Sequence, residues 1–252
     1  MLQTRIIPCL QLIDESLVKA VQFNKFGYIG DPCNTVRIFN ELEVDELCFL
    51  DIRASREGRA PNFKILQDIS DECFMPLSYG GGITTFEQAK KIFSIGFEKV
   101  ILNTQAYRNT NLITEISTHF GVQSVVASVD FKKQGNNYSA YINDGKEKIK
   151  EDILIYIKQL EKAGAGEILL TSMEKEGTWS GFDVDFIKEV TSIIKLPVIA
   201  QGGGGTIEHI REAVKLGGAS AVALGSMLVY QKKGMGVLVN FPNKLLLNAA
   251  LI

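Results

Sequence analysis

The chain has 252 residues, of which 46% are hydrophobic and 22% are charged, a composition typical of globular proteins. Its formal net charge of −2 argues against a surface that binds nucleic acid or an anionic membrane. The length is sufficient for one large hydrophobic core.

The N-terminus lacks the apolar run and cleavage site of a signal peptide, and no segment approaches about 20 apolar residues. We therefore expect a cytoplasmic protein without a transmembrane helix. The four cysteines show no metal-binding or redox spacing, and the chain has only two histidines. Free thiols are expected, with no metal and no organic cofactor.

Short runs rich in Val, Ile and Leu recur along the chain, and each is followed by an amphipathic helical pattern. This alternation predicts parallel strands covered by helices. The predicted strands lie near residues 5–11, 46–51, 76–80, 99–103, 124–130, 167–171, 197–201 and 221–226. Eight such units predict an α/β protein with one closed (β/α)₈ TIM barrel over residues 1–252, and a doubly wound open sheet is the alternative.

The two halves of the chain repeat one another when Pro76 is aligned with Pro197. The half-barrel repeats cover about residues 1–120 and 121–228, and the alignment places Gln11 opposite Asp130. The tail 229–252 departs from the pattern, and an extended segment before a short helix is expected there.

Glycine-rich turns follow the third and seventh predicted strands, and polar residues end the strands after them. Glycine lets backbone N–H groups approach an anion closely, and a helix that starts just after the turn adds partial positive charge. The pattern predicts two phosphate-binding groups on opposite sides of one mouth, although tight turns alone would also need these glycines. The candidate residues are Gly81, Gly82, Asn103, Thr104, Thr171, Gly177, Gly202, Gly203, Gly225 and Ser226.

Several motifs in order along the chain resemble HisF, the cyclase subunit family of imidazole glycerol phosphate synthase. They are RIIPCL at the start, GDP at 30–32, DELCFLDI, YGGGI, GAGEILLTS and EGT at 176–178. The resemblance covers residues 1 to about 228. It implies a lyase-type, ammonia-dependent enzyme of histidine biosynthesis that acts on a substrate with phosphate at both ends. The HisA isomerases share the half-barrel repeat but lack the charged set described next.

The resemblance also implies that a HisH-like glutaminase docks on the N-terminal barrel face and supplies ammonia through the barrel. The ammonia gate there corresponds to Arg5, Glu46, Lys99 and Glu167, although a structural ring of salt bridges is the plainer explanation. Asp130 corresponds to one catalytic aspartate. Lys19 is expected to contact phosphate or a carbonyl oxygen.

One departure from the family is chemically important. Gln11 stands where the resemblance predicts the second catalytic aspartate, and an amide cannot exchange a proton near neutral pH. Three hypotheses follow: a cyclase subunit, an ammonia-delivering subunit for amidination of an acetamido sugar in lipopolysaccharide or flagellar glycan synthesis, and a non-catalytic activator of a glutaminase. The second hypothesis adds an amidotransferase as a third partner.

Overall fold

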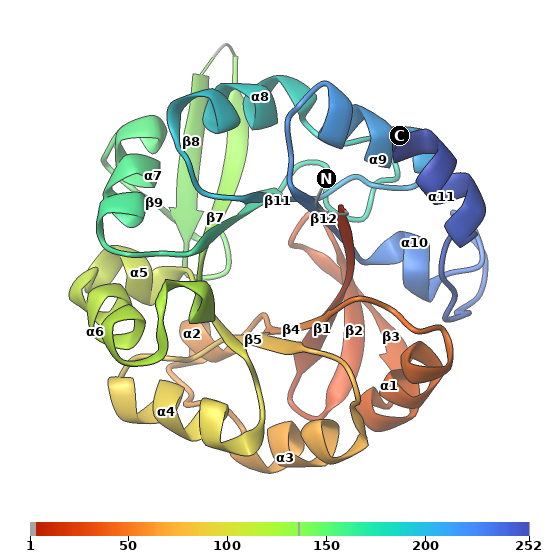
Figure 1. Ribbon diagram of the computed structural model, residues 1–252, viewed down its shortest axis with the longest axis horizontal. Coiled ribbons are helices and arrows are strands. Elements are labelled where there is room, and N and C mark those ends of the chain that lie inside the picture. Colours follow the sequence, from red (N-terminus) through yellow and green to blue (C-terminus); the bar gives the residue numbers. More distant parts are fainter. Residues whose placement is uncertain (1–3, 136, 252) are drawn as a thin grey trace.

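Eight parallel strands close into a barrel in the computed structural model, which describes residues 4–135 and 137–251 (Figure 1). The strand order β10-β11-β12-β1-β4-β5-β6-β7 is completed by pairing of β7 with β10. The barrel strands are β1 (Arg5–Ile13), β4 (Leu47–Asp51), β5 (Leu77–Gly80), β6 (Lys99–Leu102), β7 (Val125–Gln134), β10 (Glu167–Ser172), β11 (Val198–Gln201) and β12 (Ala221–Leu224). The predicted TIM barrel is confirmed, and the open sheet is wrong.

Helices surround the ring of strands (Figure 1). The longer ones are α1 (Pro32–Glu41), α3 (Phe63–Glu72), α4 (Phe86–Ile95), α6 (Asn111–Phe120), α7 (Ile153–Lys162), α8 (Val184–Ile193) and α9 (Ile207–Lys215). The shorter ones are α2 (Ala54–Glu57), α5 (Thr104–Arg108), α10 (Ser226–Val229), α11 (Lys244–Leu251) and the 3₁₀ turn Val122–Ser124. Six begin at a side-chain cap that accepts a hydrogen bond from the first turn, which fixes where each helix starts. These caps are Asp31, Asn62, Thr85, Asp152, Asp183 and Thr206.

Two antiparallel hairpins extend the barrel beyond the predicted strands. One is formed by β2 (Ser16–Val21) and β3 (Lys25–Gly30) after β1, and the other by β8 (Asn137–Ile142) and β9 (Glu147–Lys148) after β7. The sequence analysis missed both. The Asn143-Asp144-Gly145 turn, with positive φ at all three residues, is a recognisable hairpin signal that could have predicted the second one. Each predicted half of the chain thus opens with a barrel strand that continues into a hairpin, while the repeat boundaries themselves stay a prediction.

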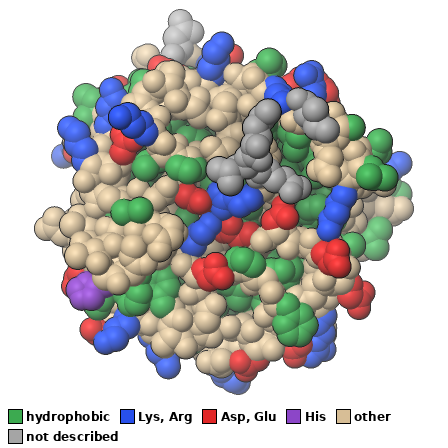
Figure 2. Space-filling view, viewed as in Figure 1, with side chains coloured by type: hydrophobic (Ala, Val, Ile, Leu, Met, Phe, Trp, Pro, Cys, Tyr) green, Lys and Arg blue, Asp and Glu red, His purple; other side chains and the backbone are tan. Residues whose placement is uncertain are grey.

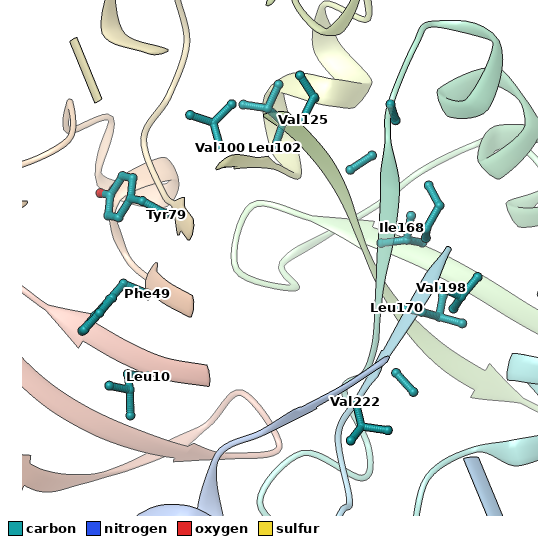
Figure 3. Packing of buried hydrophobic residues seen from close by; sticks show 14 of the residues in the cluster. Leu10, Phe49, Tyr79, Val100, Leu102, Val125, Ile168, Leu170, Val198 and Val222 are labelled. Carbon is teal, nitrogen blue, oxygen red and sulfur yellow. The ribbon is translucent and has the colours of Figure 1, made fainter. Parts of the chain in front are cut away.

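Side chains alternate between the inside and the outside of the barrel along every strand, because strand residues have a period of two. The outward side chains pack against the helices and form the main core; Figure 3 shows 14 residues of this core, among them Leu10, Phe49 and Tyr79, around the ring of strands. The inward apolar side chains form a second, smaller cluster. The interior of the barrel is therefore filled with side chains in layers. Each layer combines residues of several strands, and successive layers along one strand are two residues apart.

The C-terminal tail leaves the barrel after α10. Tyr230 forms an isolated antiparallel bridge with Val237, and the chain then runs to α11, which lies beside α9 (Figure 1). Leu247 of α11 is buried, whereas Leu245 and Leu246 are exposed. Over residues 4–135 and 137–251, no helix combines the length and the apolar character that a membrane span requires.

Candidate active site

Charged side chains close the end of the barrel where the strands begin. Arg5 donates to Glu46 at 2.7 Å and to Glu167 at 2.8 Å, and Lys99 lies 3.0 Å from Glu46 and 3.4 Å from Glu167. The four residues that the sequence singled out as a gate therefore form one continuous ring of alternating charge. In Figure 2, basic and acidic side chains meet near the middle of the barrel. Each carboxylate touches both cations, which offsets the cost of removing these charges from water.

Apolar side chains fill the layer above this ring. A narrow internal space runs between them, with Glu46 at its charged end and Ser78 as the other polar side chain in its lining. The remaining lining residues are Ile7, Cys48, Ile101, Val126, Leu169, Ile199 and Ala223. Cys9 belongs to the same layer, and its thiol lies 3.7 Å from that of Cys48. All four cysteines are free.

A cavity opens at the opposite end, where the strands finish. The strand-end residues reach it because they lie two positions beyond the apolar layer: Cys9 is followed by Gln11, Leu169 by Thr171, and Ile101 by Asn103. The lining also includes Asp51, Gly80, Gly81, Gly82, Thr104, Ser128, Asp130, Asp144, Gln201 and, from the first hairpin, Ala20, Phe23 and Phe26. This is the end at which barrels of this architecture carry their chemistry.

Asp130 is the titratable group best suited to proton transfer in this cavity. Burial away from water raises the pKa of its carboxyl to about 7. A hydrogen bond with Thr171 acts in the opposite direction, and the nearby charges of Asp144 and Glu176 raise the pKa further. Asn103 donates to the same carboxyl at 3.4 Å. Within the described part of the chain, no cationic side chain pairs with Asp130. A carboxyl with a pKa near neutrality can both accept and release a proton at physiological pH.

Two further carboxylates line the cavity, and the sequence analysis did not identify either. Asp51 accepts hydrogen bonds from the backbone N–H groups of Arg53 and Ala54 and pairs with Arg59 at 3.2 Å. Asp144 pairs with Arg56 at 2.9 Å. Asp51 ends a predicted strand, so its position was a usable signal; Asp144 comes from the unpredicted second hairpin. Their arginine partners distinguish both from Asp130.

Gln11, Lys19 and Glu176 form a buried polar cluster on one side of the mouth. The Gln11 amide donates to Glu176 at 3.1 Å and accepts from the backbone N–H of Ala20 at 2.7 Å. Lys19 forms an ion pair with the same Glu176 oxygen and donates to the Ala20 carbonyl at 3.3 Å. All three side chains are at most 5% exposed. The structure thus places Lys19 against a carboxylate rather than free in the cavity.

The first of the two predicted phosphate-binding groups lies in the cavity. Gly81, Gly82, Asn103 and Thr104 all contribute to its lining. However, the helix that follows the glycine turn begins only at Phe86, and Thr85 caps it, so it does not start just after the turn as expected. The helix that does begin at the mouth is the short α5, which starts at Thr104 directly after Asn103. Its first N–H groups provide the local positive charge on this side.

Of the second predicted group, Thr171 is the member that lines this cavity. A Cβ on Gly225 would lie 2.6 Å from the Lys19 side chain, and one on Gly203 would lie 2.1 Å from the Gly181 carbonyl. Gly177 and Gly202 approach the backbone of Ala20 and Ser172 in the same way. Ser226 starts the short helix α10 and is buried. Gly81 and Gly82 approach the chain equally closely, so these contacts do not distinguish the two groups, and phosphate binding by the second group stays a prediction.

The approach of Gly82 to its neighbours gives a direct stability prediction. Gly82 has φ +68°, and an added Cβ would lie 2.3 Å from the Arg59 carbonyl oxygen. We expect Gly82→Ala to lower the free energy of unfolding by about 2–4 kcal/mol, since it adds a steric clash to an unfavourable backbone conformation. Gly58→Ala is the matched control, because Gly58 has φ +63° with open space around it and should lose only about 1 kcal/mol. Equal losses in urea unfolding would contradict the close-approach argument.

Three or more His, Cys, Asp or Glu side chains do not gather into a metal-binding group anywhere in residues 4–135 and 137–251. The chemistry of the mouth described above is that of carboxylates, amides and hydroxyls.

Comparison with known proteins places this architecture in a family. The family described as "Histidine biosynthesis protein" matches residues 5–234. A Pseudomonas aeruginosa protein provisionally named imidazole glycerol phosphate synthase subunit hisF2 is 45% identical over 244 residues, 96% of this chain and 97% of its own. A Leptospira borgpetersenii protein provisionally named as the HisF subunit is 43% identical, with 96% of each chain covered. The imidazole glycerol phosphate synthase subunit HisF of Exiguobacterium sibiricum is 38% identical over 88% of this chain and 90% of its own.

Proposed function

This chain belongs to the histidine biosynthesis protein family, as a divergent relative of the HisF subunit of imidazole glycerol phosphate synthase, and we propose that it uses ammonia to transform a phosphate-bearing substrate. The observation that carries this proposal is the layered interior of the barrel. A charged ring, an apolar layer with a narrow internal space that is the proposed passage, and the Asp130 carboxyl, which has a pKa of about 7 and no cationic partner among the described residues, follow one another from one end of the barrel to the other.

The apolar layer suits ammonia as the nucleophile. Neutral NH₃ can cross a passage lined by Ile7, Ile101 and Leu169, whereas the ammonium ion would lose its hydration there. When NH₃ attacks a C=O or C=N carbon, its nitrogen gains a positive charge and must lose a proton. The Asp130 carboxylate is the group positioned to accept that proton and to return it to the oxygen or nitrogen that leaves.

The first glycine turn and α5 would hold a phosphate of the substrate. Gly81 and Gly82 provide backbone without side chains, and Thr104 stands at the N-terminus of α5 in the same cavity. Lys19 and the second glycine group are proposed to hold a second phosphate. The Lys19 ammonium has three hydrogens, and its contacts with Glu176 and the Ala20 carbonyl use two of them, so it can keep both contacts while it approaches a phosphate.

A glutaminase is the proposed partner, and it would dock on the face that carries the charged ring. Arg5 is the most exposed member of the ring, with a side chain 29% exposed, whereas Glu46 beneath it is 6% exposed. Ammonia released at this face would meet the apolar passage directly beyond the ring. A cytoplasmic setting is proposed with this partner.

Amidination of an acetamido sugar, with an amidotransferase as third component, is the second candidate. The observation that favours it is Gln11, because the pair of acid/base carboxylates that the cyclase resemblance implies is reduced to Asp130. In that role the barrel passes ammonia on, and a phosphorylated sugar precursor is the proposed ligand. A purely non-catalytic activator would have no use for the phosphate-binding turn or for Asp130.

The test is an ammonia-dependent turnover assay with the purified chain. Cyclase function predicts release of imidazole glycerol phosphate from the bisphosphate substrate when ammonium chloride is added, and Asp130→Asn serves as the inactive control. The amidination hypothesis predicts no such product. It predicts an amidino sugar from glutamine only when the chain, its glutaminase and the amidotransferase are all present. Absence of both activities, with no binding of sugar phosphates in calorimetry, would refute an enzymatic role.

A further inference from the structure

The Gln11 side chain is held in a single orientation by two partners of opposite character. Glu176, paired with Lys19, is a carboxylate and can only accept, so the Gln11 nitrogen must face it at 3.1 Å. The Ala20 N–H can only donate, so the Gln11 oxygen must face it at 2.7 Å. Both constraints select the same amide orientation, which removes the usual ambiguity between the oxygen and nitrogen of an amide.

This orientation leaves one hydrogen on the Gln11 nitrogen without a described partner. The amide nitrogen carries two hydrogens, and Glu176 accepts one of them. Gln11 is 5% exposed and lines the mouth cavity. An unpaired buried N–H is rarer and more costly than a carbonyl oxygen that accepts only one bond. The position therefore favours a ligand that brings an acceptor.

We propose that Gln11 is a substrate-contacting donor that holds a neutral carbonyl oxygen of the ligand. This inference rests on the proposed function: in a cyclase the held carbonyl is the group that ammonia attacks, and in sugar amidination the same donor would hold the acetamido carbonyl of the bound precursor. As the attack proceeds, the C=O π electrons move to the oxygen, and the N–H of Gln11 stabilises the negative charge that develops there. A carboxylate at position 11 could not do this, because an ionised carboxylate has no hydrogen to donate.

The charge next to Gln11 favours a neutral acceptor over an anionic one at this position. Asp130 lines the same space as Gln11 and has no paired cation among the described residues, whereas Asp51 and Asp144 are paired with Arg59 and Arg56. An anionic acceptor beside Gln11 would meet the charge of Asp130, while the ligand's phosphate would lie at the first glycine turn and α5. A ketone or an amide carbonyl meets no such repulsion. The ligand class is thus a phosphorylated small molecule that carries a ketone or an acetamido group.

Glu176 and Lys19 are positioning residues for this donor. Glu176 orients the amide, and Lys19 pairs with the same Glu176 oxygen that accepts from Gln11. Glu176 itself does not line the cavity. If the two functional groups were exchanged, position 11 would carry the carboxylate and position 176 the amide. The net charge and the side-chain lengths would stay the same, but position 11 would offer only acceptors.

The test is this exchange, Gln11→Glu combined with Glu176→Gln, measured by calorimetry with matched ligand pairs. Dihydroxyacetone phosphate against glycerol 3-phosphate tests a ketone, and N-acetylglucosamine 6-phosphate against glucose 6-phosphate tests an acetamido group. In the unmodified protein we expect the carbonyl member of at least one pair to bind about tenfold more tightly, as one hydrogen bond predicts. The exchange variant should lose that ratio while its melting temperature stays close to that of the unmodified protein.

The ratio within a pair is the informative readout, because a purely structural role would weaken both members equally. Gln11→Met removes the donor without adding charge and should abolish the ratio even if the exchange variant fails to fold. Gln67→Met, which changes an exposed glutamine bonded to Asp71 on α3, is the matched control and should keep it. An unchanged ratio in the Gln11 variants, equal binding within both pairs, or no binding of any of the four ligands would each overturn the proposal. A lost ratio without ammonia-dependent turnover in the unmodified protein would refute the proposed function and leave the ligand class standing.

Discussion

Replacing Asp130 with Asn is expected to lower ammonia-dependent turnover by about 10²–10⁴-fold, the usual contribution of a general acid–base group. Asp130 is the cavity carboxyl without a paired arginine among the described residues, and burial raises its pKa to about 7. Asn keeps the shape and the hydrogen bonds to Thr171 and Asn103 but cannot exchange a proton. In the unmodified protein, turnover should rise as the pH increases through about 7, since the carboxylate form accepts the proton from the attacking nitrogen.

Substrate affinity provides the control for this variant, because Asp130→Asn should alter the Michaelis constant far less than the maximal rate. Stability gives an independent check with a defined sign. A carboxyl whose folded-state pKa is raised from 3.8 to about 7 stabilises the fold fully below pH 3.8, and this stabilisation is lost as the pH rises through about 7. The stability of Asp130→Asn relative to the unmodified protein should therefore improve by at least about 1 kcal/mol between pH 4 and pH 8. A pH-independent difference in stability, or an Asn variant that retains full turnover, would contradict the assignment.

Replacing Lys99 with Met is expected to lower the free energy of unfolding by about 2–4 kcal/mol, because Glu46 and Glu167 would lose one of their two shared cations. Glu46 is 6% exposed and Glu167 is 13% exposed, so water replaces the lost contact only in part. We expect a smaller loss than for a fully buried ion pair, because the side chains of the ring remain partly exposed to water. Denaturant unfolding at pH 7 measures it.

Arg37→Met is the matched control for the ring, because Arg37 pairs with Glu72 on the surface with a side chain 57% exposed, and it should change stability by less than about 1 kcal/mol. Adding Glu46→Gln to Lys99→Met should recover part of the loss, because it removes one uncompensated charge. If the ring also admits ammonia, Lys99→Met should impair glutamine-driven turnover more than turnover driven by added ammonium. Equal stability losses at Lys99 and Arg37 would show that the ring is no more than a surface network.

The two ends of the barrel differ in how much of their arrangement could be predicted from the positions of residues along the strands. The family resemblance implied a charged set of Arg5, Glu46, Lys99 and Glu167, and their positions at or just before strand starts agree with a place at one end of the barrel. Glycine turns placed Gly81 and Gly82 in the lining of the mouth, and their role as a phosphate site stays a prediction. The role of the second glycine group also stays a prediction; spacing did not indicate that Lys19 lies beside Gly225 and pairs with Glu176, which is 157 residues away in sequence.

The sequence by itself determined the eight barrel strands and the helices between them. Short apolar runs followed by amphipathic helical patterns are local properties of the chain, so they can be read from the order of its residues. Only the tertiary structure decided the orientation of the Gln11 amide, the pairing of Asp51 and Asp144 with arginines, and the position of Asp130 away from any cationic partner among the described residues. Those features depend on which loops meet at the mouth of the barrel. The contacting segments are far apart in sequence, so no local pattern of residues shows which of them pack together.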